Sequence, residues 1–176
     1  MSANTFSFHL ECIATPIGDM LVVADDQGRL RALGWADLEE RLKRQLTSRY
    51  GDLQLRSRPV STSIRTGLLA YLDGKLDAID SIPVESGGTA FQRSVWEQLR
   101  RIPAGTTMSY GDFAVRIGRP KAVRAVGHAN GANPICIVVP CHRLLGADGS
   151  LTGYGGGLPR KRWLLDHEAA AQGKLI

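Results

Sequence analysis

The sequence comprises 176 residues, 43% of them hydrophobic, which is enough for one domain or two small domains with buried cores. The formal net charge of +5 permits a polyanionic partner but does not require one. Residues 1–9 lack a basic start followed by a long apolar run, and every apolar run is too short to cross a bilayer. We therefore expect no signal peptide, no membrane partner and a cytoplasmic location.

The three cysteines, Cys12, Cys136 and Cys141, cannot all be paired and form no Cys-x-x-Cys motif. A reducing compartment with free thiols is therefore favoured over a disulfide scaffold. A structural zinc site needs four ligands, and His9 and Cys12 have no further candidates nearby. We expect neither a metal nor another cofactor.

The first half of the chain begins with β structure and continues with helices. Alternating apolar residues and turn signals predict strands at residues 9–13, 20–24 and 29–35. Asp37 is the expected N-cap of a helix that ends at about Tyr50. Ser61 or Thr62 is expected to cap a second helix that ends at Leu72.

The domain boundary is expected at residues 85–88, whose serine and glycine content is typical of a linker. A short edge segment at residues 79–84 precedes it. We therefore divide the chain into a first domain of residues 1–86 and a second domain of residues 87–176.

Helical signals dominate after the linker. Thr89 is the expected cap of an amphipathic helix. Two short helices follow at residues 113–117 and 121–130, and the turn Gly118-Arg119-Pro120 joins them. Such a pair makes a helix-turn-helix, a motif whose second helix enters a groove of DNA.

The second of these short helices is nearly bare, because small residues such as Ala122 and Ala125 occupy most of it. A base-reading helix usually presents arginine, asparagine or glutamine, so this helix should approach DNA closely and read little sequence. Arg124 is its one long central side chain, either a solvated residue or a contact to a phosphate or the base stack. Arg119 and Lys121 add positive charge beside it.

The run Ile137-Val138-Val139 has the pattern of a short buried strand, and Pro140 should end it. Cys141 would then lie at the exit of a rigid element. A buried cysteine is usually inert. However, His142 and Arg143 follow at once, and a neighbouring cation lowers a thiol pKa from about 8.5 to roughly 3.5–7.5. We interpret Cys141 as a nucleophile.

A glycine-rich loop at residues 152–157 holds one aromatic residue, Tyr154. Its glycines would let the backbone approach a flat ligand, on which Tyr154 could stack. A phosphate-binding loop is disfavoured, because the required lysine and hydroxyl residues do not follow.

The final helix is expected at residues 159–171 and begins with a basic cluster at residues 160–162. It also contains Glu168. That acid is either a surface residue or the group that orients His142 as a base for Cys141.

Several of these segments follow one another in a characteristic order: Ile-Val-Val before Pro140-Cys141-His142-Arg143, the preceding helix-turn-helix and Asn133-Pro134, and the later Gly153-Tyr154 and Trp163-Leu164-Leu165-x-His167-Glu168. In this order and spacing, residues 91–168 closely resemble the O6-alkylguanine-DNA alkyltransferases, also called methylated-DNA–protein-cysteine methyltransferases. The first half agrees in outline. The resemblance implies an α+β fold. An N-terminal antiparallel sheet with helices, ribonuclease H-like, would precede a C-terminal winged helix-turn-helix domain that carries the active site.

The resemblance implies catalytic roles for four residues. Cys141 would accept the alkyl group, and His142 would take its proton through a water. Glu168 would orient the imidazole. Tyr110 would help to rotate the 3′ phosphate and would donate a proton to guanine N3 as guanine leaves.

The resemblance also implies the contacts to DNA and to the base. Arg124 would fill the space left by the flipped nucleotide, and further DNA contacts would come from Arg119, Lys121, Ala122 and Ala125. The residues implied for the substrate pocket are Asn133, Leu144, Tyr154, Gly155 and Gly156. Asn133 would brace the turn before the active site. The carbonyls of Cys141 and Leu144 would accept from the guanine amino group, and the amide of Gly155 would face O6.

The implied function is direct-reversal repair of double-stranded DNA. The alkyl group of O6-alkylguanine, and also of O4-alkylthymine, would move to Cys141 after the base is flipped. The thioether product is a poor leaving group, so the protein would act once. We expect a monomer, and cooperative binding on DNA is left open.

The chain departs from some relatives. Some have serine where this chain has Gly155, and inactive relatives have tryptophan in place of Cys141. No zinc-binding extension precedes the domain, which disfavours the transcriptional variety that repairs phosphotriesters. Two alternatives remain: a catalytically silent DNA-binding module that senses lesions or regulates genes, and a cysteine hydrolase that uses Cys141, His142 and Glu168.

Overall fold

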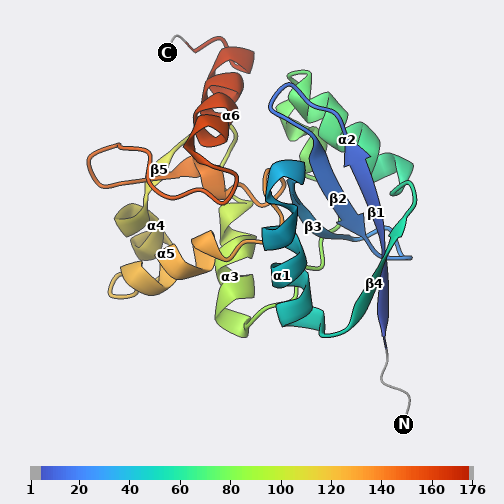
Figure 1. Ribbon diagram of the computed structural model, residues 1–176. Coiled ribbons are helices and arrows are strands. Elements are labelled where there is room, and N and C mark those ends of the chain that lie inside the picture. Colours follow the sequence, from blue (N-terminus) through green and yellow to red (C-terminus); the bar gives the residue numbers. More distant parts are fainter. Residues whose placement is uncertain (1–4, 175–176) are drawn as a thin grey trace.

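A computed structural model describes residues 5–174 (Figure 1). Residues 1–4, part of the stretch in which no signal peptide is expected, lie outside the described residues. The fold is mixed α+β: a four-stranded sheet lies on one side of the molecule and a group of helices on the other. No helix within residues 5–174 is long and apolar enough to cross a membrane.

The sheet has the strand order β3-β2-β1-β4. Its strands are β1 (Phe6–Ile13), β2 (Met20–Ala24), β3 (Leu30–Trp35) and β4 (Leu53–Ser57). The pairs β1–β2 and β2–β3 are antiparallel, as their hairpin turns predict. The expected antiparallel sheet is nevertheless wrong at its edge, because β4 is parallel to β1. The chain returns from β3 to β4 through a helix, the kind of connection that parallel pairing requires.

The helix that makes this connection begins later than predicted. Ala36–Leu38 forms a 3-10 turn, and α1 spans Glu39–Tyr50. Asp37 is therefore not the N-cap of α1. Its carboxylate accepts hydrogen bonds of 2.9 and 3.1 Å from Arg160 on the last helix, α6 (Leu158–Ala171). Asp37 thus links the first half of the chain to α6.

The two faces of the sheet are covered by different helices. Leu42 and Leu46 of α1 pack on one face, and Ile64 and Tyr71 of α2 (Thr62–Leu72) pack on the other. All residues of β2 are buried as a result. Figure 1 shows α1 between the sheet and the helices of the second half. This position brings α1 close to the functional site.

The second half of the chain is mostly helical. Its elements are α3 (Ala90–Leu99), β5 (Met108–Ser109), α4 (Tyr110–Arg116), α5 (Val123–Gly131), β6 (Leu144–Leu145) and α6. Thr89 caps α3 as predicted: its hydroxyl accepts from the amide of Gln92 at 3.1 Å, and the Gln92 side chain accepts from the Thr89 amide at 3.0 Å. Ser61 precedes α2 but makes no side-chain cap. Helices α4 and α5 lie where the helix-turn-helix is expected, although α4 starts earlier and α5 later than predicted.

The core is continuous between the two halves. Leu33 and Trp35 of the sheet belong to the same buried cluster as Trp96 of α3 and Leu164 of α6. In the predicted edge segment, Val84 makes a single bridge to Leu30, after a 3-10 turn at Leu76–Ile79. The domain boundary between residues 86 and 87 stays a prediction.

The predicted strand at residues 137–139 is wrong. These residues are buried, but they lie in consecutive turns. Ile137 has a φ of 71°, a left-handed conformation that β-branched residues rarely adopt. Only Ile135 pairs with the sheet, through a bridge to Leu33. Cys141 therefore begins a 3-10 turn, Cys141–Arg143, and does not follow a strand.

Candidate active site

Cys141 lies in the wall of a cavity of about 320 Å³. Four of the predicted site residues line this cavity: Tyr110, Cys141, Tyr154 and Gly155. Its other lining residues, which sequence reasoning missed as pocket residues, are Arg41, Gly127, Asn130, Gly131 and Gly153. The cavity is therefore built from α1, α4, α5, the turn at Cys141 and the glycine-rich loop.

Two buried asparagines hold the turn that carries Cys141. The Asn133 amide group donates to the carbonyl of Val139 at 2.8 Å, and its oxygen accepts from the amide of Ile135 at 2.9 Å. Asn130, at the end of α5, donates to the carbonyl of Cys141 at 3.4 Å. Asn133 thus lies behind the cavity, where it fixes the backbone. The strained turn at Ile137 persists because such surroundings over-determine it.

The Cys141 thiol is only 4% exposed, yet its pKa is lowered. The largest cause is a hydrogen bond from the Cys136 thiol, which more than offsets the effect of burial; Asn133 and the charge of Lys161 lower the pKa further. Cys136 itself keeps its proton, because the hydrogen bond to Cys141 and burial raise its pKa well above the usual value.

The cation beside the thiol is thus not the one that the sequence predicts. We expected His142 and Arg143 to stabilise the thiolate, but the guanidinium of Arg143 binds Glu168 instead. The positive charge that favours the thiolate comes from Lys161. It is fully buried, and its ammonium group donates to the carbonyls of Leu144 at 2.6 Å and Thr152 at 2.8 Å. Burial lowers the pKa of Lys161.

The predicted basic cluster at residues 160–162 is therefore not a surface patch. Lys161 faces the core, and Arg160 binds Asp37 while its guanidinium lies 4.5 Å from the centre of the Trp35 ring. Arg162 alone of the three is exposed. Neighbours in a helix point in different directions, which a count of charges along the sequence does not reveal.

His142 and Glu168 form a fully buried pair, with 2.7 Å between Nε2 and Oε1. Burial lowers the pKa of His142, and the charges of Arg143 and Lys161 act in the same direction against the raising effect of Glu168. The neutral imidazole therefore donates from Nε2 to the carboxylate, which leaves a lone pair on Nδ1. Nδ1 is buried and has no hydrogen-bond partner within residues 5–174.

Glu168 accepts hydrogen bonds from four residues and is not a surface acid. Besides His142, the donors are the Tyr71 hydroxyl at 2.7 Å, Arg143 at 2.7 and 3.0 Å, and the amide of Gly105 at 3.1 Å. Burial opposes ionisation of this carboxyl. The hydrogen bond from His142, together with the hydrogen bonds and the charge of Arg143, outweighs burial and holds the pKa of Glu168 well below its usual range. Tyr71 and Gly105 were missed because no local pattern marks them.

The glycines of the 152–157 loop differ in their surroundings. A Cβ atom on Gly155 would lie 3.1 Å from Nη2 of Arg41, so a serine there would require the arginine to shift. Gly156 does not line the cavity. A Cβ atom on Gly156 would lie 2.5 Å from Nε1 of Trp35, so Gly156 packs closely against this residue of the sheet. Its assignment to the substrate pocket is not supported by this geometry.

The predicted DNA contacts lie outside the cavity. Arg119, Lys121, Arg124 and Ala125 are exposed, and Ala122 precedes the first turn of α5. Arg124 borders a separate hollow, which it shares with Gly127, His128, Gly131 and Ala132. The exposed side of α5 therefore adjoins the cavity of Cys141, because Gly127 and Gly131 line both.

Side chains of α1 and α3 hold the C-terminal end of α5. Arg41 donates to the carbonyl of Gly131 at 3.2 Å, and Arg49 donates to that of Ala132 at 2.7 Å. Trp96 donates to the carbonyl of Ala129 at 2.8 Å. The last carbonyls of a helix have no intrahelical partner, so these donors stabilise the end of α5. Sequence reasoning missed this contact.

The site combines the exposed side of α5 with a buried thiol of lowered pKa, and the proteins that the chain resembles are methyltransferases that act on DNA. Residues 90–170 match the family described as 6-O-methylguanine DNA methyltransferase, DNA binding domain. A Salmonella typhimurium protein named methylated-DNA–protein-cysteine methyltransferase is 49% identical over 160 residues, which are 90% of this chain and 94% of that protein. A Haemophilus influenzae protein of the same name is 41% identical over 154 residues, 88% of this chain and 82% of that protein.

Solved structures show the same fold. The Mycobacterium tuberculosis O6-methylguanine methyltransferase superposes with a TM-score of 0.77 at 40% identity, over 93% of this chain and 94% of that chain. A structure of the Mycobacterium tuberculosis OGT in complex with DNA gives a TM-score of 0.76 at 41% identity, with the same coverage. The chain belongs to the methylated-DNA–protein-cysteine methyltransferase family, whose members act in DNA repair by alkyl transfer.

The buried carboxylate makes a prediction for stability. Replacing Glu168 by glutamine leaves Arg143 without a counter-charge, so we expect a loss of about 3–5 kcal/mol in the free energy of unfolding at pH 7. Folding lowers the pKa of Glu168, so its contribution is complete above the unfolded value of about 4.3 and is lost as the pH falls below it. The unfolding free energy of Glu168→Gln should therefore fall less steeply below pH 5 than that of the wild type.

Denaturant unfolding at several pH values measures both effects. The matched control is Asp166→Asn, which removes a carboxylate from the same helix, where the Asp166 side chain is 41% exposed and lies 4.0 Å from Arg162. We expect this control to change stability by less than about 0.5 kcal/mol. Equal losses in the two variants would contradict the account of Glu168.

The hydrogen bond between the two buried thiols makes a prediction for reactivity. Replacing Cys136 by alanine removes the largest cause of the lowered Cys141 pKa, so that pKa should rise. The rate of Cys141 alkylation by iodoacetamide should then reach its half-maximum at a higher pH. Mass spectrometry of the peptide that contains Cys141 follows this rate. Cys12→Ala, which alters an exposed cysteine, should leave the profile unchanged.

Proposed function

We propose that the protein repairs double-stranded DNA by transferring the alkyl group of O6-alkylguanine to Cys141, once per molecule. The observation that carries this proposal is the lowered pKa of the Cys141 thiol in a cavity beside the exposed side of α5. The buried His142–Glu168 pair supports the same reaction. A silent lesion-sensing module would need neither feature, and a cysteine hydrolase would leave α5 without a use.

The burial of Cys141 supports base flipping. The thiol is 4% exposed, so a base stacked within a duplex would not reach it. The base is rotated into the cavity, whose small lining residues Gly127 and Gly131 let α5 lie close to the backbone. Arg124, exposed beside these glycines, fills the space that the nucleotide leaves. Exposed Arg119 and Lys121 contact flanking phosphates, and Ala122 and Ala125 allow the close approach.

The reaction begins with proton transfer from the Cys141 thiol through a water to Nδ1 of His142. Glu168 holds Nε2–H and stabilises the imidazolium that forms. The thiolate attacks the alkyl carbon, so an S–C bond forms as the C–O6 bond breaks and its electron pair stays on guanine. Tyr110, which lines the cavity, donates a proton to N3 and neutralises the leaving base. The proton that His142 took from the thiol then passes to Tyr110 and restores its hydroxyl group. The products are a thioether and guanine.

The walls of the cavity support recognition of a purine. Tyr154 stacks on the base, and the amide of Gly155 faces O6. The carbonyls of Cys141 and Leu144 accept from the exocyclic amino group. The Leu144 carbonyl already accepts from Lys161 at 2.6 Å, but a carbonyl oxygen has a second lone pair.

The proposal has a wider scope than guanine alone. O4-alkylthymine presents an alkylated oxygen to the same thiol and is a second substrate.

The protein acts as a monomer in the cytoplasm. Its first part is ribonuclease H-like, and α4 and α5 belong to a winged helix-turn-helix that carries the active site.

The intact mass of the protein tests the proposed function. After mixing with an equimolar duplex that contains one O6-methylguanine, the protein should gain the mass of one methylene group, and the duplex should contain guanine. Cys141→Ala should gain nothing, whereas Cys12→Ala should gain the same mass as the wild type. An unchanged mass and an intact lesion, from folded and reduced protein, would contradict alkyl transfer and favour the lesion-sensing module.

A further inference from the structure

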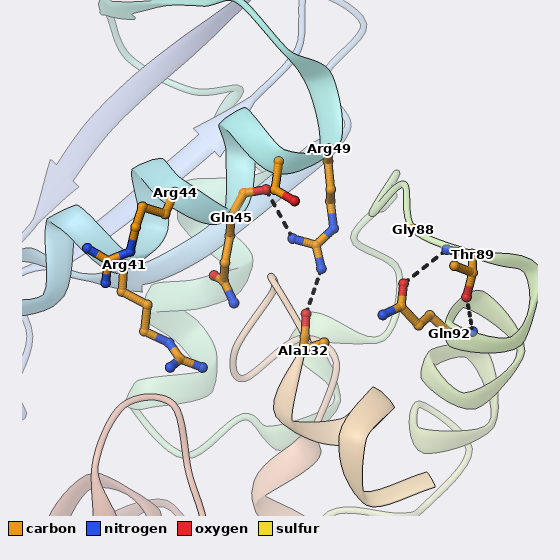
Figure 2. A pocket seen from close by; sticks show the side chains of 9 residues that line it. Arg41, Arg44, Gln45, Arg49, Gly88, Thr89, Gln92 and Ala132 are labelled. Carbon is orange, nitrogen blue, oxygen red and sulfur yellow. Dashed lines mark hydrogen bonds between the residues drawn. The ribbon is translucent and has the colours of Figure 1, made fainter. Parts of the chain in front are cut away.

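A third hollow, of about 700 Å³, lies where α1 faces the start of α3 and the end of α5. We call it the arginine groove, and it is defined by Arg41, Arg44, Gln45, Arg49, Thr89 and Gln92. Figure 2 shows Gln45 and Arg49 extending from α1 toward Ala132 and Arg41 extending to one side of them, with Thr89 and Gln92 at the start of α3 on the other side. Arg41 and Arg49 hold the end of α5, but neither the proposed alkyl transfer nor the proposed DNA contacts use the space between these residues.

The groove is positively charged. Three of its lining residues are arginines, and no carboxylate is among the described residues that line it. Glu39, on the same helix, is engaged elsewhere by Lys43, with 2.9 Å between the charged atoms. The guanidinium of Arg44 is exposed and makes no hydrogen bond or ion pair within residues 5–174. Its charge is therefore available to an anion.

The other two arginines are fixed in place. Arg49 donates to the carbonyls of Ala132 at 2.7 Å and Gln45 at 3.3 Å, and its guanidinium lies 5.5 Å from the Trp96 ring centre (Figure 2). Arg41 donates once, to Gly131. These contacts are to neutral carbonyls, so they orient the guanidinium groups without neutralising them. The positive charge is thus held in position before any ligand arrives.

The groove is continuous with the surface assigned to DNA. Ala132 lines both the arginine groove and the hollow that contains Arg124. Arg41 lines both the groove and the cavity of Cys141. A polyanion that follows the exposed side of α5 past Arg124 would therefore reach the arginine groove.

We propose that the arginine groove binds backbone phosphates of the DNA duplex beyond the contact made by α5. This inference rests on the DNA-binding half of the proposed function, because it places the same duplex against α1. Arginine presents planar donors that match a phosphate, and the Gln45 amide adds a neutral donor beside them. The first half of the chain thus takes part in holding DNA and does more than support the active site.

Binding to an undamaged duplex tests the proposal without alkyl transfer. Fluorescence anisotropy of a labelled duplex at several salt concentrations gives the affinity and its dependence on salt. Arg44→Ala should weaken binding to every duplex sequence and lower the slope of log K against log salt by about 0.9, the value for one lost phosphate contact. The variant should fold normally, because the Arg44 side chain is exposed and makes no hydrogen bond or ion pair within the described residues.

Lys43→Ala is the matched control. It removes the same charge from the adjacent position of α1, but Lys43 does not line the groove. It should leave the slope nearly unchanged. Equal changes in the two variants would show a general effect of charge and would overturn the proposal. A loss of cooperativity in Arg44→Ala, with an unchanged salt slope, would also overturn it by placing a second copy of the chain in the groove.

The intact-mass measurement separates this proposal from the proposed function. At saturating damaged duplex, Arg44→Ala should still gain one methylene group, since Arg44 does not line the cavity of Cys141. The wild type could gain no mass while Arg44→Ala, and not Lys43→Ala, lowers the slope of log K against log salt. In that case the proposed function fails and the phosphate site stands. If transfer proceeds and the slopes of Arg44→Ala and Lys43→Ala agree, the phosphate site fails alone.

Discussion

The buried carboxylate of Glu168 is the interaction on which the rest of the active site depends. A charge in this position would be costly without partners, and four residues donate to it. Buried ion pairs add little net stability, but removing one partner is strongly destabilising, so this arrangement fixes one geometry above all. It holds Nε2 of His142, and the base thereby presents Nδ1 to its surroundings. The proposed role of His142 as the base for Cys141 depends on this orientation.

The same carboxylate unites the two halves of the chain. Tyr71 reaches it from α2, whereas His142 and Arg143 come from the second half. Other hydrogen bonds between the halves join Asp37 to Arg160 and Arg49 to Ala132. The first half therefore does not act as a separate appendage. It supplies one donor to the buried carboxylate of Glu168 and holds the end of α5, which adjoins the cavity of Cys141.

A thiol beside ionisable groups, together with the resemblance, predicted Cys141, His142 and Glu168 as one site. The structure brings His142 and Glu168 into contact, and the roles of the three residues stay predictions. The strand predicted at residues 137–139 was wrong, because a short buried apolar segment has the same sequence pattern in a strand and in packed turns. Strand β4 was missed, although Leu53 and Leu55 alternate with polar residues, and its parallel pairing depends on the crossover through α1. Lys161 could not be placed, because only three-dimensional packing shows that it faces the core.

The tautomer of His142 tests the central claim most directly. In protein labelled with ¹⁵N, the imidazole nitrogens of His142 report by NMR which of them carries the proton at neutral pH. The account predicts a neutral ring with the proton on Nε2, toward Glu168, and an unprotonated Nδ1. A proton on Nδ1 alone, or a doubly protonated ring at neutral pH, would contradict it, because neither form offers a base to the Cys141 thiol.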